Sequence, residues 1–332
     1  MSRILSGIQP TSKIHIGNYF GAVQNWVKLQ NQYECFFCVV DLHAISMPYN
    51  PEELKNNTLD MYIALLACGL DPQKAVVFIQ SMVPEHTYLM WLLNCVTSYG
   101  ELGRMTQFKD KSQYLQESSK DYFISAGLFN YPILQAADIL IYKANYVPVG
   151  KDQEQHLELS RNIAMRFNHL FGEYFPLPEP LFTNTAKVMS LADPTKKMSK
   201  SLGDKHYIGL FDNEETIRNK VKKAVTDMGT TPDGEMSPGV RNLFEIIKAC
   251  GRNDLYDQMM KDYQSGNLMY KNLKETTAEV IIELLKPISE KRSNLLQNLD
   301  YVNKIISEGN EMARETASKT LQEVKSLMGF TY

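Results

Sequence analysis

The stretch that decides the fold is Arg3-Ile-Leu-Ser-Gly-Ile-Gln-Pro-Thr-Ser-Lys-Ile-His-Ile-Gly-Asn18, near the amino terminus. Residues 3–8 carry the signal of a strand, and a helical pattern begins at Gly17. Backbone amides and the dipole at the start of such a helix create a site for an anion. Gly17 would let a flat base or a ribose approach the backbone without a Cβ clash. The stretch therefore indicates either the nucleotide-binding turn of an α/β sheet or an ordinary strand-to-helix turn.

Outward from this stretch the chain alternates strand and helix signals, which is typical of a parallel α/β sheet. The helix after Asn50 has the clearest ends, because Asn50 is a good N-cap, Pro51 suits the first turn and Gly69 follows the last. The elements predicted in this part are a strand at 3–8, a helix at 17–32, a strand at 35–42, the helix after Asn50 and a strand at 75–80.

The middle of the chain is mostly helical from residue 86 to about residue 142. A polar stretch at 106–119 interrupts this pattern, and we expect its Lys109, Asp110 and Lys111 to lie in a surface loop. The elements predicted next are a strand at 146–149, a helix at 153–168, a strand at 186–191 and a lysine-rich loop at 195–201.

Strand signals nearly vanish after about residue 211. Helical periodicity continues at 214–225, 240–249, 274–285 and 288–327. We therefore predict two domains: a Rossmann-type catalytic domain at 1–211 and a helical domain at 212–332. The fold class is α/β, with a doubly wound parallel sheet and a helical insertion in the first domain.

The composition is that of a globular protein. The chain has 332 residues, of which 44% are hydrophobic and 22% charged, so it can bury a sizeable core. No segment approaches the roughly 18 uncharged apolar residues that a membrane span requires, and the start lacks a secretory apolar region, so we expect no membrane and no export. The five cysteines are odd in number and lie largely in apolar runs, which favours the reducing cytoplasm. A net charge of -3 means that any RNA binding depends on local basic patches.

We predict no metal site. Cys35 and Cys38 form a CxxC pair with His43 downstream, but a metal site normally needs a second pair of ligands. These two cysteines also lie in an apolar run that reads as a strand.

A second stretch with chemical content is the lysine cluster Lys196-Lys-Met-Ser-Lys-Ser201. A lysine run by itself is usually a solvated surface. Together with His15-Ile-Gly-Asn18 at the other end of an α/β domain, however, it fits a two-part ATP site in which cations neutralise charge that develops on the phosphates.

These two segments resemble the HIGH and KMSKS signatures of class I aminoacyl-tRNA synthetases. The first differs at its last position, where Asn18 replaces histidine, a change that tryptophanyl members of the class commonly accept. The similarity to the bacterial tryptophanyl family runs from Leu5 to about Asp227 and then thins. The further stretches that carry it are Gly100-Glu-Leu-Gly-Arg-Met-Thr-Gln-Phe-Lys-Asp-Lys-Ser112, Ala136-Ala-Asp-Ile-Leu140 and Val147-Pro-Val-Gly-Lys-Asp-Gln153.

The resemblance implies an ATP site assembled from distant parts of the chain. Residues after the first strand would line the adenosine side, Val188 would pack beside the base, and the lysine loop would close over the phosphates. Lys197 and Lys200 would be catalytic cations, with Lys111 as a third candidate, although a lysine in a polar stretch is often only solvated. The ATP-binding residues so implied are Gln9, Pro10, Thr11, Gly17, Asn18, Gly150, Lys151, Asp152, Val188, Lys197, Met198, Ser199, Lys200 and Ser201.

The resemblance also implies a tryptophan site. Asp138 matches the residue that accepts the indole N–H in the family, and Tyr131 and Gln153 match groups that hold the substrate amino group. Asp138 could instead be a core residue bonded to the backbone, but a buried carboxylate is costly without partners. Gln135 stands where many bacterial members have methionine, and it could share indole recognition. The tryptophan-binding residues so implied are Asp138, Tyr131, Gln153, Gln135 and His43.

The activity implied is ATP-dependent activation of L-tryptophan with release of pyrophosphate, followed by transfer to the 3′ end of tRNA(Trp). Mg²⁺ would enter with ATP. The helical domain would contact the anticodon end of the tRNA, and the family implies a homodimer. The alternatives are a tyrosyl-tRNA synthetase and a catalytically silent relative that senses tRNA or tryptophan. Four basic residues are either phosphate contacts or a solvated helix face: Arg218, Lys220, Lys222 and Lys223.

Overall fold

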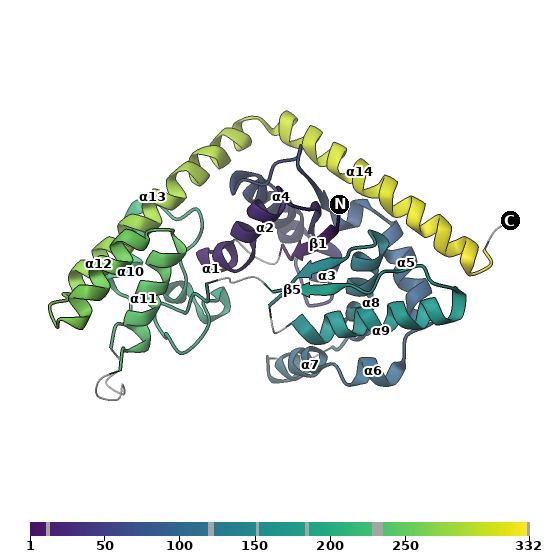
Figure 1. The fold of residues 1–332 in the computed structure, drawn as a ribbon, viewed down its shortest axis with the longest axis horizontal. Helices are drawn as coiled ribbons and strands as arrows, with labels where there is room; N and C mark the ends of the chain where they lie inside the picture. The colour runs from purple at the N-terminus through teal and green to yellow at the C-terminus, as the bar shows by residue number, and fades with distance from the viewer. Residues whose placement is uncertain (11–13, 119–122, 151–152, 183–185, 228–234, 331–332) are drawn as a thin grey trace.

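The computed structural model describes residues 1–10, 14–118, 123–150, 153–182, 186–227 and 235–330. Its centre is a parallel sheet with the strand order β3-β2-β1-β4-β5 (Figure 1). The strands are β1 (Arg3–Ile8), β2 (Glu34–Val39), β3 (Ala75–Ile79), β4 (Tyr146–Pro148) and β5 (Glu179–Leu181). The chain builds outward from β1 to one edge and then from β4 to the other, so the predicted doubly wound Rossmann-type sheet is confirmed.

Strand β2 shows how the sheet is buried. Successive side chains of a strand point to opposite faces. Cys35 and Phe37 accordingly belong to the apolar core on one face, whereas Phe36 and Cys38 belong to the core on the other. Because both faces are covered, the strand reads as an unbroken apolar run. The same alternation places the thiols of Cys35 and Cys38 on opposite faces, so these two side chains cannot bind one metal ion together.

Helices that follow β1 and β2 cover the first face. The helix after Asn50 has the predicted ends, since the Asn50 side chain accepts hydrogen bonds from the backbone N–H groups of Glu52 and Glu53, and Gly69 has a φ of 111°. The predicted helix at 17–32 is a continuous helical segment with a π-helical turn inside it. The elements on this face are α1 (Ile16–Asn18), the π-helical turn Tyr19–Val23, α2 (Gln24–Leu29) and α4 (Pro51–Ala67).

Residues 85–171 form most of the second face and its surroundings. The elements are α5 (Glu85–Asn94), α6 (Tyr99–Gly103), α7 (Thr106–Ser118), α8 (Ala126–Ile141) and α9 (Glu154–Phe171). The prediction of a polar loop at 106–119 is wrong, because residues 106–118 form α7, while residue 119 lies outside the described residues. A sparse stripe at helical spacing explains the difference: Phe108, Ser112 and Leu115 face α8, and the rings of Phe108 and Phe129 lie 5.2 Å apart.

The chain after residue 211 is helical in its described part, as predicted. The helix α12 was not predicted, although it carries apolar side chains at helical spacing that pack, partly buried, against the core: Leu255, Tyr256, Met259, Met260 and Tyr263. The predicted helix at 274–285 is the middle of a longer helix that continues through Pro287, and Asn298 separates it from the last one. The elements are α10 (Glu214–Lys222), α11 (Pro238–Ala249), α12 (Asn253–Gln264), α13 (Tyr270–Gln297) and α14 (Leu299–Leu327).

The helix α14 returns to the sheet and covers its edge strand β3, while α13 and α14 together arch over the molecule (Figure 1). The Asn310 side-chain oxygen accepts a hydrogen bond of 2.9 Å from the Ile79 backbone N–H. The Tyr62 hydroxyl donates to the Val77 carbonyl at 2.9 Å. These side chains satisfy edge groups that would otherwise be open to another strand.

Two further expectations concern strands and membranes. The strand expected at 186–191 is wrong for its described residues: only Met189 pairs, in an isolated antiparallel bridge with Lys197. The chain turns back on itself between Ser190 and Lys196, whose backbone groups bond at 2.8 Å, so there is no room for a longer ladder.

Across the described residues, every helix is either too short or too polar to span a membrane.

Candidate active site

A cavity of about 430 Å³ opens at the point where the strand order reverses, beside the carboxyl ends of β1 and β4. Doubly wound sheets bind ligands at this place. Apolar side chains such as Leu5, Val40 and Val147 form part of its wall. The cavity brings together these residues that the sequence predicted for the site: Gln9, Asn18, His43, Lys111, Tyr131, Gln135, Asp138 and Gln153.

Asp138 lies at the buried end of this cavity and is held by three neighbours. The Nε2 of His43 lies 2.8 Å from its Oδ2, and the Nδ1 of His86 lies 2.6 Å from its Oδ1. The amide nitrogen of Gln80 lies 2.8 Å from both oxygens. Burial acts to raise the pKa of Asp138, but the hydrogen bonds from His43 and His86 outweigh it and hold the pKa at about 2. The cavity therefore ends in a permanent carboxylate.

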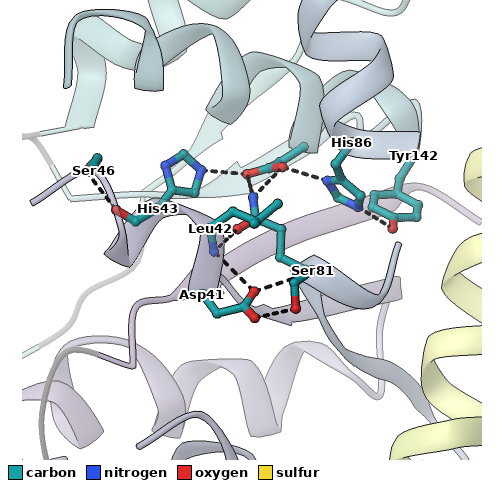
Figure 2. Close-up of polar contacts among 9 residues, drawn as sticks. Asp41, Leu42, His43, Ser46, Ser81, His86 and Tyr142 are labelled. Atoms are coloured by element: carbon teal, nitrogen blue, oxygen red, sulfur yellow. Dashed lines mark hydrogen bonds and ion pairs between the residues drawn. The ribbon is translucent and has the colours of Figure 1, made fainter. Parts of the chain in front are cut away.

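The Gln80 amide has a fixed orientation. Its oxygen accepts a 3.1 Å hydrogen bond from the Leu42 backbone N–H, so its nitrogen faces Asp138. Leu42 belongs to the short helix α3 (Asp41–Ala44), which ends the predicted strand 35–42 earlier than expected. Asp41 in turn accepts hydrogen bonds from the backbone N–H of Ser81 at 2.9 Å and from its hydroxyl at 2.5 Å (Figure 2). The carboxyl ends of β2 and β3 are thereby clamped together around Asp138.

Tyr131 lies further along the cavity wall, between α7 and α9. Its hydroxyl donates to the Gln107 side-chain oxygen at 3.2 Å and lies 2.8 Å from the His156 Nε2. The Lys111 ammonium lies 4.4 Å from the centre of the Tyr131 ring. Burial lowers the pKa of Lys111. Lys111 is thus a half-buried cation on a helix that faces the cavity, rather than a solvated lysine in a loop.

The start of α1 is organised by His15 and Asn18. The His15 backbone N–H donates to the Asn18 side-chain oxygen at 3.2 Å, and the Asn18 backbone N–H donates to the His15 Nδ1 at 3.3 Å. This reciprocal pair is a capping box. Burial lowers the pKa of His15 to about 4, and the nearby charges of Lys200 and Lys197 lower it further. The ring is therefore neutral, and because Nδ1 accepts a bond, its hydrogen is on Nε2.

The lysine loop packs against this helix start. Met198 is buried, and its backbone N–H donates to the Val188 carbonyl at 3.1 Å. A Cβ added to Gly17 would lie 2.9 Å from the His15 ring, so glycine leaves room for the ring that caps this helix start, and the same Cβ would be in contact with the Met198 Cβ at 3.4 Å. The two segments that the sequence paired therefore touch in the folded chain.

The rest of the lysine loop is anchored by Tyr207. The Lys200 ammonium lies 5.7 Å from the Tyr207 ring centre, and the Lys220 ammonium lies 4.6 Å from it. Lys220 also bonds to Asp204 at 2.8 Å and to Asp212 at 3.0 Å. The Lys220 side chain is thus held in two ion pairs and is largely buried, which fits neither a solvated helix face nor a free phosphate contact. The Ser199 side chain caps the short turn that follows by accepting from the Ser201 N–H at 3.3 Å.

The remaining predicted residues lie apart from the cavity or beyond the described chain. Pro10 is buried directly after β1, and Gly150 is exposed beyond β4. Val188 is buried beneath Met198. Thr11, Lys151 and Asp152 lie outside the described residues.

Several residues of this site received no role from the sequence. Gln80 and His86 contact Asp138, and Tyr142 contacts His86 at 2.8 Å. Gln80 could have been found, because it ends a predicted parallel strand, and the carboxyl ends of such strands line the ligand crevice. His86 and Tyr142 could not have been found. They do not follow a predicted strand, and no local sequence pattern distinguishes them from other core residues. Within the part of the chain that the structure describes, no group of His, Cys, Asp or Glu side chains could hold a metal ion.

Known proteins resemble this chain along nearly its whole length. A protein of Clostridium tetani named tryptophan–tRNA ligase is 49% identical over 331 residues, which cover 98% of this chain and 95% of that protein. The crystal structure of tryptophanyl-tRNA synthetase from Mycoplasma pneumoniae superposes with a TM-score of 0.87 at 37% identity and covers 99% of this chain and 98% of that chain. The tryptophanyl-tRNA synthetase from Campylobacter jejuni, solved with ADP and tryptophan, gives a TM-score of 0.84 at 34% identity, with coverage of 98% and 99%.

The family model described as tRNA synthetases class I (W and Y) matches residues 1–286. This match includes the sheet, the cavity at its switch point and both the His15 and the Lys200 segments. The chain therefore belongs to the class I tRNA synthetases for tryptophan and tyrosine.

Proposed function

We propose that this chain activates L-tryptophan with ATP to tryptophanyl-adenylate, releases pyrophosphate, and transfers the amino acid to the 3′ end of tRNA(Trp). The single observation that carries the proposal is the cavity at the switch point, which has a buried carboxylate at one end and cations near its other side. The names of the relatives that share nearly the whole chain support it.

We assign the amino acid to the Asp138 end of the cavity. Asp138 would accept the indole N–H, and the His43 ring beside it would form part of the pocket wall. Tyr131 and Gln153 would hold the substrate amino group further along the cavity, which both of them line. Gln135 lines the same cavity and could share the indole N–H with Asp138. An apolar cavity with a few convergent polar groups suits a ligand of this shape.

We assign ATP to the side of the cavity where β1 ends and α1 begins. Gln9, Gly17 and Asn18 would face adenosine, and the helix start would favour an anion. His15, which received no role from the sequence, would present its Nε2–H toward the same region. The remaining predicted residues would complete the site: Pro10, Thr11, Gly150, Lys151, Asp152, Val188, Met198, Ser199 and Ser201.

The reaction needs little covalent chemistry from the protein. The tryptophan carboxylate would attack the α-phosphate in line, and pyrophosphate would leave. Lys197 and Lys200, which lie close enough to His15 to lower its pKa, would stabilise the leaving charge together with Lys111 and with the Mg²⁺ that enters with ATP. Closure of the lysine loop would make these contacts strongest in the transition state.

We propose that tRNA binding uses helices of the predicted domain at 212–332, whose last helix α14 packs against the sheet of the catalytic domain at 1–211. Of the basic candidates on α10, Lys222 and Lys223 remain exposed, and Arg218 pairs only loosely with Glu279 at 3.7 Å. Exposed cations on a helix can position a nucleic acid through its phosphates.

We also propose a cytoplasmic homodimer. Support for a second copy comes from exposed apolar side chains on α5, α6 and α9, since large exposed apolar patches mark protein interfaces. These are Tyr88, Trp91, Tyr99, Met165 and Leu170. Free buried thiols at Cys35, Cys38 and Cys68 suit a reducing compartment. The mass of the chain in solution, measured by sedimentation, tests the dimer.

The decisive experiment is amino-acid-dependent ATP–pyrophosphate exchange with tryptophan and tyrosine. We expect kcat/KM to favour tryptophan by roughly 10²-fold or more, because the tyrosine ring is smaller and places its hydroxyl donor differently from the indole N–H. As a matched variant, Lys200→Ala should bind tryptophan normally but exchange roughly 10²-fold more slowly. A preference for tyrosine would overturn the substrate assignment. Tryptophan binding without any exchange would identify a silent sensor instead.

A further inference from the structure

Next to Asp138, but outside the lining of the cavity, lie two buried residues that the reaction does not use directly, His86 and Tyr142 (Figure 2). Both have no exposed surface. Together with Asp138 they form a chain of hydrogen bonds, in which the His86 Nδ1 lies 2.6 Å from the Asp138 Oδ1 and the His86 Nε2 lies 2.8 Å from the Tyr142 hydroxyl. The chain leads from the core to the anionic end of the cavity.

The chemistry of these groups determines the direction of each hydrogen bond. An ionised carboxylate only accepts, so the His86 Nδ1 carries a hydrogen and donates it to Asp138. In the neutral form of the ring, Nε2 then accepts, and the Tyr142 hydroxyl donates to it. The surroundings of Tyr142 are apolar, since the Phe36 ring stacks on it at 4.5 Å and the Phe78 ring lies 5.4 Å away. Tyr142 is thus the partner that holds the far side of the His86 ring in its orientation toward Asp138.

Asp138 keeps one acceptor position for a ligand. A carboxylate offers roughly four lone-pair sites. His43 and His86 each use one, and the Gln80 nitrogen, equidistant at 2.8 Å from both oxygens, uses a third when its hydrogen points to one of them. The three donors therefore fix the plane of the carboxylate and leave room for one more N–H from the cavity side.

We propose that His86 and Tyr142 are positioning residues for amino-acid selection, which hold the Asp138 carboxylate so that it receives the indole N–H of the substrate. The inference rests on the proposed function, because it assumes that tryptophan occupies this cavity. It assigns a role in specificity to two residues that touch neither the substrate nor the reacting atoms.

The Tyr142 hydroxyl holds the far side of the His86 ring, while the Asp138 carboxylate keeps the hydrogen on Nδ1. Without this hydroxyl, the buried Nε2 of His86 has no donor, and the ring loses one of the two hydrogen bonds that fix its orientation. The ring can then tilt away from the position in which its Nδ1–H supports Asp138. The carboxylate would then lose the orientation that suits the indole N–H. An asparagine at position 86 has no Nε2 that needs a donor and places its amide nitrogen where the Nδ1 lies, so it should not need Tyr142.

The test uses tryptophan and an isostere, 3-(benzothiophen-3-yl)alanine, in which sulfur replaces the indole N–H. The quantity measured is the ratio of kcat/KM for the two amino acids in ATP–pyrophosphate exchange. We expect Tyr142→Phe and His86→Leu each to lower this ratio by about tenfold or more, since each variant weakens a charge-assisted hydrogen bond between the indole N–H and Asp138. The double variant His86→Asn with Tyr142→Phe should regain most of the wild-type ratio.

The matched control is Tyr62→Phe, which removes another buried hydroxyl, the one bonded to the Val77 carbonyl at 2.9 Å. It should lower thermal stability but leave the ratio unchanged. Thermal unfolding of every variant separates loss of fold from loss of selection. An unchanged ratio in Tyr142→Phe, or no recovery in the double variant, would overturn the inference. A wild-type chain that does not activate tryptophan would instead contradict the proposed function.

Discussion

Asp138 is a full negative charge in a part of the core with almost no solvent contact. Burying such a charge is costly unless hydrogen bonds replace those of water. His43, Gln80 and His86 supply them, and all three come from elements other than the helix α8 that carries Asp138. A carboxylate assembled in this way is typical of a ligand acceptor, because a purely structural aspartate would use the nearby backbone.

Substitutions at Asp138 and Gln135 separate two acceptors for the indole N–H. Asp138→Ala should lower kcat/KM for tryptophan by roughly 30- to 1,000-fold with little change in ATP affinity, because a charged acceptor is removed. It should also lower the melting temperature, since it strands the His43, Gln80 and His86 donors. Gln135→Met keeps the length of the side chain and removes only the amide, so activity should stay within about threefold. Tryptophan-dependent pyrophosphate exchange measures both.

The reverse pattern would contradict this assignment. If Gln135→Met loses roughly 30-fold or more while Asp138→Ala stays within about threefold, Gln135 reads the indole. The double variant adds a check, because two residues that share one hydrogen give effects that do not add.

At the scale of elements, α14 is the helix whose role is clearest from its contacts. Its first half packs into the core on one face of the sheet through Val302 and Ile305, and its second half packs into the other core through Ala313 and Val324. Between them, at Gly309, the helix crosses the edge strand β3. A single helix therefore seals the edge and joins the two faces.

Gly309 should be necessary for this crossing. A Cβ at this position would lie 2.0 Å from the Val77 carbonyl oxygen, which is a backbone atom and cannot move alone. Gly309→Ala should therefore lower the free energy of unfolding by about 1–3 kcal/mol. Gly103 at the end of α6 is the matched control, because a Cβ there meets nothing within 4 Å. Gly103→Ala should change stability by less than about 1 kcal/mol. The free energy of unfolding of both variants is measured in urea. Equal losses of stability would show that the close approach of Gly309 to β3 is not the cause.

At the scale of the whole molecule, folding should depend on pH through His15. Its pKa is about 4 in the folded chain against an ordinary value of 6.5. As the pH falls from 6.5 toward 4, the unfolded chain takes up a proton that the folded chain refuses, so unfolding is increasingly favoured. Above 6.5 both states hold a neutral ring, and this dependence ends. Asp138, with a pKa of about 2 against 3.8, adds a second loss of stability only below about pH 4.

The variant His15→Asn tests the pH dependence. Asparagine is a good N-cap, so the start of α1 should persist without a titratable ring. The free energy of unfolding, measured in urea from pH 7 to pH 4, should fall more steeply in the wild type than in His15→Asn. If the free energy of unfolding falls equally with pH in both proteins, the burial of His15 does not contribute to the pH dependence of stability.

The parallel sheet, four of its five strands and most of its helices could be predicted because their signals are local. Strand β5 was missed, because it has three residues centred on Pro180. An apolar run such as Cys35–Val39 needs both faces covered, and a helix that starts at Asn50-Pro51 and ends before Gly69 carries its own caps. The prediction of secondary structure failed where the sequence pattern was weak or where the conformation depends on a distant segment. Helix α7 has too sparse an apolar stripe to stand out from a polar loop, and the residues around Met189 are extended only because Lys197 pairs with them.

The sequence by itself determined the fold class, the place of the strand-to-helix turn at His15–Asn18, the lysine loop at Lys197–Ser201 and the family resemblance, because each depends on neighbours along the chain. Only the tertiary structure decided which side chains surround Asp138. His43, Gln80 and His86 reach it from three separate elements, and the contact of Gly17 with Met198 joins segments far apart in the chain. Such contacts depend on how helices and strands pack across the sheet, and periodicity along the chain carries no record of that packing.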